Sequence, residues 1–212
     1  MQYNLNTETE ALESLFDAFN RQIFGGRIPK AVITVQRDGG LKAKGYFTPW
    51  EAWKEIDGEK TAACEIAITG EILNRSPLEI AETMLHEMVH AWNYSRGIKD
   101  CTRKGTFHNK KFAEAATFAG LEVTTDKKYG HITVGFEDNS TALKLAVEWD
   151  KEIKEASTFE KVRWEPPKAK PTKKAQKSFK YACPCCETVI TAKSEKLHVR
   201  CMDCDMDFIL QD

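Results

Sequence analysis

Residues 76–97 read SPLEIAETMLHEMVHAWNYSRG and contain the most strongly predicted helix of the chain. Ser76 can cap this helix, Pro77 suits its first position, and Glu79 completes the S-x-x-E pattern of a capping box. Gly97 is a natural end for it. The apolar residues between these ends cover most of the helix circumference: Ile80, Ala81, Met84, Leu85, Met88, Val89 and Trp92. This distribution predicts a helix that is buried on more than one side.

The same helix carries the motif HEMVH at residues 86–90. His86 and His90 are four residues apart, so both imidazoles project from one face, roughly 5–6 Å apart at Cβ, and can reach one zinc ion. Glu87 cannot join them as a ligand at this spacing, but it is placed to act as the catalytic acid/base on a water. The alternative is two structural histidines beside a surface charge. Burying these three side chains without a partner would cost several kcal/mol, which favours the metal site.

A catalytic zinc needs a third protein ligand and an open position. His108 is the leading candidate, because it precedes a predicted helix over 110–119 that could pack against the first one. Glu114, about one and a half turns into that helix, is the second candidate. His131 opens a predicted strand and comes third.

Helical and strand-like patterns alternate around this motif. Helices are predicted over 8–23, 110–119 and 141–156, and strands over 32–36, 44–48, 62–69 and 131–136. Residues 51–60 and 96–111 are predicted loops. These elements predict an α+β fold class in which helices pack on a small mixed sheet.

Five of the seven cysteines fall within residues 183–204, CPCCETVITAKSEKLHVRCMDC. Two C-x-x-C pairs with fourteen residues between them have zinc-ribbon spacing, and four thiolates would close the shell of a structural zinc: Cys183, Cys186, Cys201 and Cys204. Cys185 is the spare cysteine, and it could replace Cys186 through a C-x-C pairing. Disulfides are the weaker alternative, because the amino terminus does not resemble a signal peptide and a reducing compartment is expected.

Charge is balanced over the whole chain and concentrated locally. Thirty-one Lys and Arg against thirty-two Asp and Glu give a net charge of −1, which excludes a basic nucleic-acid coat protein. Residues 166–180 hold six Lys and no acid, a composition typical of a linker. We therefore expect a catalytic domain over 1–160, a basic linker over 161–178 and a zinc ribbon over 179–212. No apolar run approaches the ~18 residues of a membrane span.

The order of these segments resembles the SprT-like metallopeptidases, the family of bacterial SprT and of the DNA–protein crosslink protease Spartan. The matching phrases are FNRQIFGGRIP, AACEIAIT, SPLEIAETMLHEMVHAW and FHNKKF, followed by the four-cysteine ribbon. The resemblance implies an HExxH zincin-like fold with His86, His90 and His108 on the catalytic zinc and Glu87 as acid/base. It also implies an edge strand that binds the substrate chain, and residues 62–69 look like that strand. The family commonly has Gly after the third ligand, where this chain has Asn109.

Basic residues near the proposed site predict contacts with DNA phosphates that do not depend on base sequence. The candidates, in the loop and the linker, are Arg103, Lys104, Lys110, Lys111, Lys168, Lys170, Lys173, Lys174 and Lys177. The alternative is that these lysines only keep the surface soluble.

The sequence therefore predicts a zinc endopeptidase that cleaves DNA-associated or DNA-crosslinked proteins, with one catalytic and one structural zinc. We expect a monomer in the cytoplasm, on the nucleoid of a bacterium or in the nucleus of a eukaryote, with a protein substrate and no membrane partner. Two alternatives stay open. One is a non-catalytic, DNA-associated zinc adaptor, and the other is a cytosolic metallopeptidase unconnected with DNA.

Overall fold

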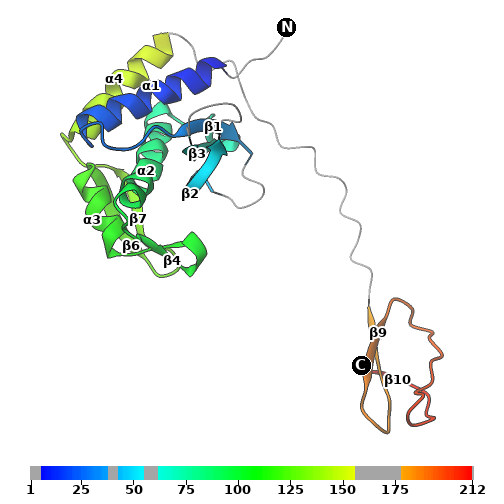
Figure 1. Ribbon diagram of the computed structural model, residues 1–212. Coiled ribbons are helices and arrows are strands. Elements are labelled where there is room, and N and C mark those ends of the chain that lie inside the picture. Colours follow the sequence, from blue (N-terminus) through cyan, green and yellow to red (C-terminus); the bar gives the residue numbers. More distant parts are fainter. Residues whose placement is uncertain (1–5, 38–42, 55–61, 156–177, 212) are drawn as a thin grey trace. The chain divides into compact units, whose positions relative to one another are not determined.

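The computed structural model describes residues 6–37, 43–54, 62–155 and 178–211. The chain divides into two compact units, Met1–Glu165 and Pro166–Asp212. The first contains α1 (Asn6–Gln22), β1 (Val32–Gln36), β2 (Gly45–Lys54), β3 (Ala62–Thr69), η1 (Gly70–Ile72), α2 (Pro77–Ser95), β4 (Cys101–Thr102), η2 (Arg103–Gly105), β5 (Phe107–His108), α3 (Lys110–Phe118), β6 (Leu121–Asp126), β7 (Gly130–Phe136) and α4 (Thr141–Glu155) (Figure 1). The second contains β8 (Phe179–Ala182), β9 (Val189–Ala192) and β10 (Ile209–Gln211). The predicted linker lies outside the described residues except at its last position. No described helix is long and apolar enough to cross a membrane.

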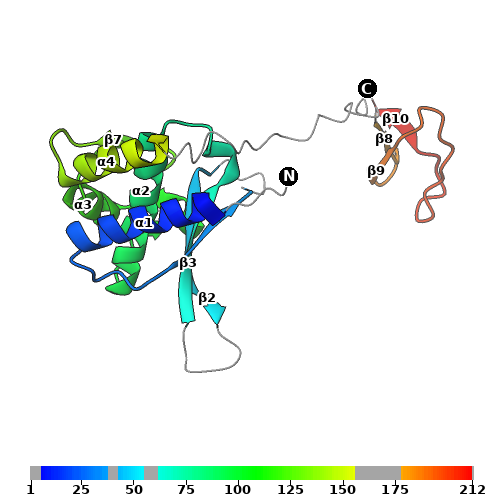
Figure 2. The same ribbon diagram turned by 90° about the horizontal axis from the view of Figure 1, so that it is seen from above.

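The first sheet has the strand order β1-β3-β2, with β1 parallel and β2 antiparallel to β3. The expectation that residues 62–69 form an edge strand is therefore wrong. β3 is the central strand, and it is buried continuously from Glu65 to Thr69, as is typical of a strand covered on both sides. β2 is an edge strand, and Figure 2 shows it projecting with β3 beyond the helices. It continues through part of the predicted loop to Lys54, with an irregular register between Thr48 and Trp53.

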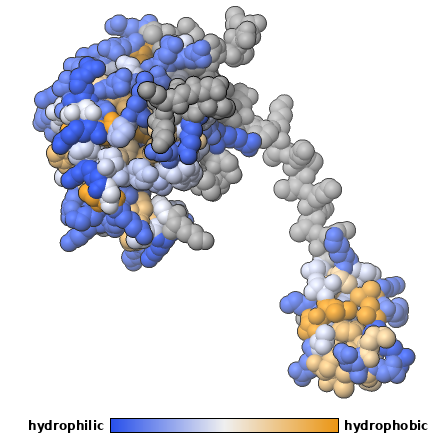
Figure 3. Space-filling model, viewed as in Figure 1, coloured by the Kyte–Doolittle hydropathy of each residue, from blue (hydrophilic) through white to orange (hydrophobic). Residues whose placement is uncertain are grey.

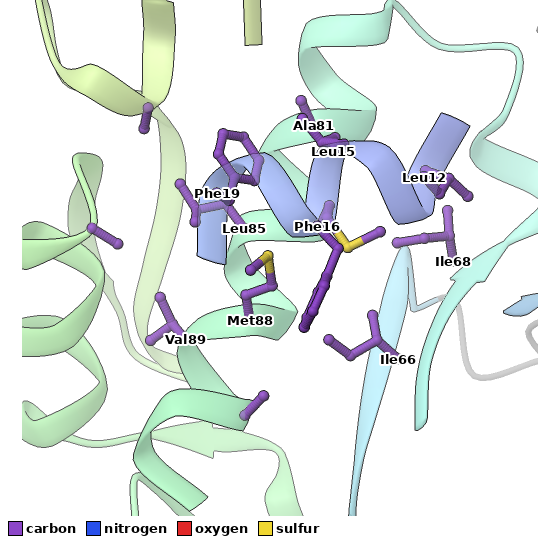
Figure 4. Close-up of a cluster of buried hydrophobic side chains, with 14 of the residues drawn as sticks. Leu12, Leu15, Phe16, Phe19, Ile66, Ile68, Ala81, Leu85, Met88 and Val89 are labelled. Carbon is purple, nitrogen blue, oxygen red and sulfur yellow. The ribbon is translucent and has the colours of Figure 1, made fainter. Parts of the chain in front are cut away.

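Helix α2 is the core helix of the N-terminal unit. Its predicted capping box is present, with Ser76 and Glu79 each bonded to the other's backbone. Figure 4 shows side chains of α1, β3 and α2 meeting in one apolar cluster around Phe16, Ile66 and Met88. Helix α4 lies beside α1, and the Trp149 indole donates a hydrogen bond to the Ala11 carbonyl at 2.9 Å. The helices predicted over 8–23, 110–119 and 141–156 are confirmed to within two residues at each end.

A second sheet, with the order β4-β5-β7-β6, lies beside α3. The predicted loop over 96–111 in fact contains β4, η2 and β5, and β6 was not predicted. In this sheet His108 of β5 pairs with Gly130 of β7. Gly130 has φ +78°, and a Cβ there would lie 2.2 Å from the His108 carbonyl oxygen. Only glycine permits this close approach, which fixes the position of His108.

The C-terminal unit is a small antiparallel sheet with the order β10-β8-β9. Among its described residues, the buried apolar ones are Tyr181, Cys183 and Cys201. The Tyr181 hydroxyl donates to the Ser194 carbonyl at 2.9 Å. Figure 3 shows apolar residues gathered on the visible surface of this unit. A core this small leaves little hydrophobic stabilisation, and two of its three buried apolar residues among those described are cysteines.

Candidate metal centres

Three histidines converge in the N-terminal unit. His86 and His90 come from successive turns of α2, and His108 comes from β5. Their ring centroids are 5.1, 5.0 and 5.0 Å apart, and one ring nitrogen from each lies within 4.8 Å of the others. All three side chains are half-buried. The structure thus brings together the three predicted ligands from two separate elements, with nitrogen donors suited to a metal such as zinc.

The Nδ1 atom of each ring is already engaged by the protein. His86 Nδ1 lies 3.0 Å from Thr133 Oγ1, whose hydroxyl donates to Glu82 at 3.0 Å. His90 Nδ1 lies 2.8 Å from Asp100 Oδ2, and His108 Nδ1 lies 2.8 Å from the His131 carbonyl oxygen. Since these groups accept a hydrogen bond from Nδ1–H, Nε2 is the nitrogen of each ring that remains for a metal. Hydrogen bonds of this kind orient metal-binding histidines in general.

Phe112 of α3 forms the floor of the histidine cluster. Its ring centroid lies 4.8 Å from His86, 4.8 Å from His90 and 4.2 Å from His108. Phe112 itself is fully buried. The rings are therefore held from below by packing and at Nδ1 by hydrogen bonds.

The three imidazoles differ in basicity. Burial lowers the pKa of His86 well below its usual value, and burial lowers the pKa of His108 to about 4. Burial is the largest single influence on His90 and opposes its charge, but the hydrogen bonds with Asp100 and Cys101 and the negative charges of Glu87 and Asp100 together outweigh it and raise the pKa of His90 to about 10. Two of the three ligands are therefore neutral, and a metal must displace one proton from His90.

Glu87 is buried beside the histidines, next to the edge strand β2. Burial raises the pKa of its carboxyl to about 7, partly opposed by His90 and by a hydrogen bond from the Phe47 backbone N–H. Gly45 permits the close approach of the strand, because a Cβ there would lie 3.2 Å from Glu87 Cγ and 2.9 Å from the Ala67 carbonyl oxygen. A carboxyl with a pKa near neutral can both accept and return a proton.

A profile of the SprT-like family matches residues 12–130. The chain belongs to the SprT-like family. The matched range contains the three histidines, Glu87 and Asp100. A search of curated proteins and a search of solved structures each gave no match.

The cysteine cluster lies beyond the part matched by the SprT-like profile. Cys183, Cys186, Cys201 and Cys204 place their sulfur atoms within 4.8 Å of one another, and Cys186 Sγ lies 3.7 Å from Cys201 Sγ. Zinc–sulfur bonds of about 2.3 Å in a tetrahedron put sulfurs about 3.8 Å apart. The group is therefore compatible with a metal ion. Cys185 is exposed and lies outside the cluster.

Both cysteine pairs are built on the same backbone turn. The Glu187 N–H donates to the Cys183 carbonyl at 3.0 Å, and the Asp205 N–H donates to the Cys201 carbonyl at 2.9 Å. Glu187 and Asp205 each follow the second cysteine of a pair, with φ +59° and +55°. Hydrogen bonds from Thr188 lower the pKa of Cys186 to about 6, which favours the thiolate that binds metal.

The other site residues predicted from the sequence do not belong to either of the two clusters, as far as the structure describes them. Glu114 pairs with Lys111 at 3.1 Å on the exposed surface, outside the cluster. His131 contributes only its backbone carbonyl, as the partner of His108. Arg103 lies over the Phe107 ring at 4.4 Å. Lys110 is exposed at the start of α3.

Six other lysines were predicted from the sequence to contact DNA phosphates. The side chain of Lys104 and five linker lysines lie outside the described residues: Lys168, Lys170, Lys173, Lys174 and Lys177.

Three residues that contact the histidines were not predicted from the sequence, namely Asp100, Thr133 and Phe112. Asp100 was visible as the single acid within an otherwise basic segment, but Thr133 and Phe112 had no distinguishing local pattern.

Proposed function

We propose that this SprT-like protein is a zinc-dependent endopeptidase with an HExxH zincin-like catalytic domain over residues 1–160. The observation that supports this most strongly is the histidine cluster, whose three Nδ1 atoms are hydrogen-bonded while the three Nε2 atoms stay free beside a buried carboxyl. A purely structural site does not need that carboxyl. The same proposal assigns a basic linker to residues 161–178 and a ribbon with a structural zinc, held by the four cysteines, to residues 179–212.

In this proposal, His86, His90 and His108 hold the catalytic zinc. When bound, zinc would polarise the scissile carbonyl and lower the pKa of a water molecule. Glu87 accepts the proton of that water and delivers it to the leaving amine. Its raised pKa suits both steps near neutral pH. The Phe47 N–H keeps one side of the carboxylate fixed.

The substrate chain would bind along β2. An extended peptide adds readily to an exposed strand edge, where backbone hydrogen bonds hold it without reading its sequence. β2 is an edge strand, and its Phe47 N–H already points to Glu87. A peptide paired with β2 would therefore pass beside the catalytic carboxyl.

We propose that the substrates are proteins bound or crosslinked to DNA. The support is the family membership together with the basic residues of the segment 96–111 and of the linker. A DNA-associated adaptor without activity, and a peptidase indifferent to DNA, remain the competing functions.

The decisive experiment is cleavage of casein by the zinc-loaded full-length protein, with and without DNA. Glu87→Gln should abolish cleavage while zinc content stays unchanged, because the glutamine amide cannot accept the proton. Glu114→Gln is the matched control and should cleave normally, since Glu114 is exposed, pairs with Lys111 and does not belong to the histidine cluster. Equal zinc and equal activity in wild type and Glu87→Gln would contradict the peptidase. Activity that DNA does not change would favour the DNA-independent enzyme.

A further inference from the structure

An open pocket of about 430 Å³ lies between the end of α2 and α3. Trp92, Asn93 and Arg96 line it from α2 and the residue after it. Lys111 and Phe118 line it from α3, and Arg27 reaches it from the segment between α1 and β1. The proposed peptidase mechanism uses none of these side chains to contact a substrate.

The pocket carries a net positive charge, from Arg27, Arg96 and Lys111 against Glu114. Arg27 and Arg96 each place their guanidinium carbon 4.9 Å from the centre of the Trp92 ring. Within the described part of the chain neither guanidinium has an ion pair, and the one lining acid, Glu114, is paired with Lys111. Two guanidinium groups without ion pairs, both packed on one indole and both lining one pocket, form a site for an anion, and their planar forks match phosphate geometry.

The pocket also offers a flat apolar surface. Phe118 is 59 % exposed although it is a large aromatic residue, and its ring centroid lies 6.5 Å from that of the buried Phe24. Trp92 is covered, so Phe118 and the outer faces of the two guanidinium groups are the surfaces on which a ring can stack. Aromatic residues beside cationic ones are the usual means of binding single-stranded nucleic acid.

We infer that this pocket binds single-stranded nucleic acid, with a phosphate on Arg27 and Arg96 and a base stacked on Phe118. A single strand is required because a base within a duplex has no free face to stack on Phe118. An acidic polypeptide would use the two guanidinium groups equally well, but it would leave Phe118 unused.

The pocket adjoins the histidine cluster. Asn93 lines the pocket and donates to Asp100 Oδ2 at 3.1 Å, and the same oxygen accepts from His90 at 2.8 Å. Lys111 of the pocket precedes Phe112, the floor of the cluster. The inference thus deepens the proposed function by stating where the nucleic acid binds, but binding itself does not require the protein to be a peptidase.

The test is fluorescence anisotropy of a labelled oligothymidylate with the full-length protein across a series of salt concentrations. Arg27→Ala combined with Arg96→Ala should weaken binding at least tenfold at low salt. It should also reduce the slope of log affinity against log salt by about 0.7, the contribution of one lost phosphate contact on a single strand. Phe118→Ala should weaken binding about fivefold through lost stacking and leave the salt slope unchanged.

Matched controls separate the pocket from charge in general. Lys144→Ala combined with Lys151→Ala removes two exposed positive charges from α4 and should change affinity less than twofold. Arg103→Ala tests the predicted loop contact outside the pocket. If the arginine pair fails to fold, as judged by thermal denaturation, Arg27→Lys with Arg96→Lys replaces it. That pair should keep the salt slope and lose affinity severalfold, because lysine lacks the planar fork.

Three results would overturn the inference: pocket variants that bind like wild type, an α4 pair that weakens binding as much as the arginine pair, or polyglutamate that competes as well as the oligonucleotide while Phe118→Ala has no effect. The last result would assign the pocket to an acidic polypeptide. Casein cleavage is measured separately. Cleavage without pocket-dependent binding refutes only this inference, and pocket-dependent binding without cleavage refutes only the proposed peptidase.

Discussion

The two candidate metal clusters differ in the size of the apolar core around them. The three histidines belong to a unit with a large apolar core, whereas the C-terminal unit has a small core that consists largely of its own cysteines. Each histidine is held at Nδ1 by a hydrogen bond and from below by Phe112. In the ribbon, the buried apolar residues among those described are Tyr181 and two of the cysteines themselves. The surrounding residues therefore position the histidines, whereas the cysteines are themselves a large part of the core of the C-terminal unit. The two should respond differently when a ligand is removed.

Removing ribbon ligands should have the largest effect. Cys183→Ser combined with Cys186→Ser should unfold the C-terminal unit and lower the zinc content from two ions to one per chain, because metal binding contributes about 10–16 kcal/mol in small zinc domains. The thermal unfolding of the N-terminal unit should stay unchanged. Limited proteolysis and elemental analysis measure the two effects. Cys185→Ser is the control and should keep two zinc ions; a double variant that also keeps two would refute the ribbon site.

His108→Ala should weaken zinc binding and abolish cleavage without unfolding the unit that contains it. We expect the zinc affinity of the histidine site to fall by more than about 100-fold and casein cleavage to be lost, since two imidazoles hold zinc poorly. The N-terminal unit should still unfold cooperatively, because its core does not depend on the metal. His131→Ala is the matched control: His131 contributes only its backbone carbonyl, so zinc and activity should remain. Loss of zinc in Glu114→Ala, with zinc retained in His108→Ala, would show that the ligand is Glu114.

Asp100→Asn should have an intermediate effect on the histidine site alone. The amide oxygen can still accept from His90 Nδ1, but the negative charge that favours its proton is lost. Outer-shell residues of this kind typically change metal affinity by 10–100-fold. Competition with a chelator measures the affinity, and the ribbon zinc of the same chain is the internal control. Equal weakening at both sites, or no weakening at either, would contradict the positioning role of Asp100.

The contrast between the clusters also explains what could be predicted from the sequence. The HEMVH motif and both cysteine pairs depend on spacings of three or four residues within one element, so they were visible locally. Asp100 and Thr133 act through contacts between different elements. Asp100 stood out only as the single acid of a basic segment, and no local pattern marks Thr133. The edge position of residues 62–69 was inferred from the family resemblance. It was wrong because the pairing of β1 with β3 is a long-range contact that no local pattern marks. The short strands of the segment 96–111 likewise form only through their partners in the second sheet.

The smallest predicted effect concerns the two ribbon turns. Glu187 has φ +59°, a conformation that costs an L-residue about 1–2 kcal/mol and costs glycine almost nothing. Glycine also raises the entropy of the unfolded chain, which removes about 0.4–1 kcal/mol of that gain. Glu187→Gly should therefore stabilise the zinc-loaded ribbon by about 0.5 kcal/mol, measured as resistance to unfolding in denaturant. Glu195→Gly is the matched control on the same unit. Glu195 is exposed and has no positive φ, so only the entropic loss applies and the ribbon should be weakened. If both variants weaken the ribbon equally, the turn at Glu187 is not strained, and the zinc–sulfur bonds alone determine its geometry.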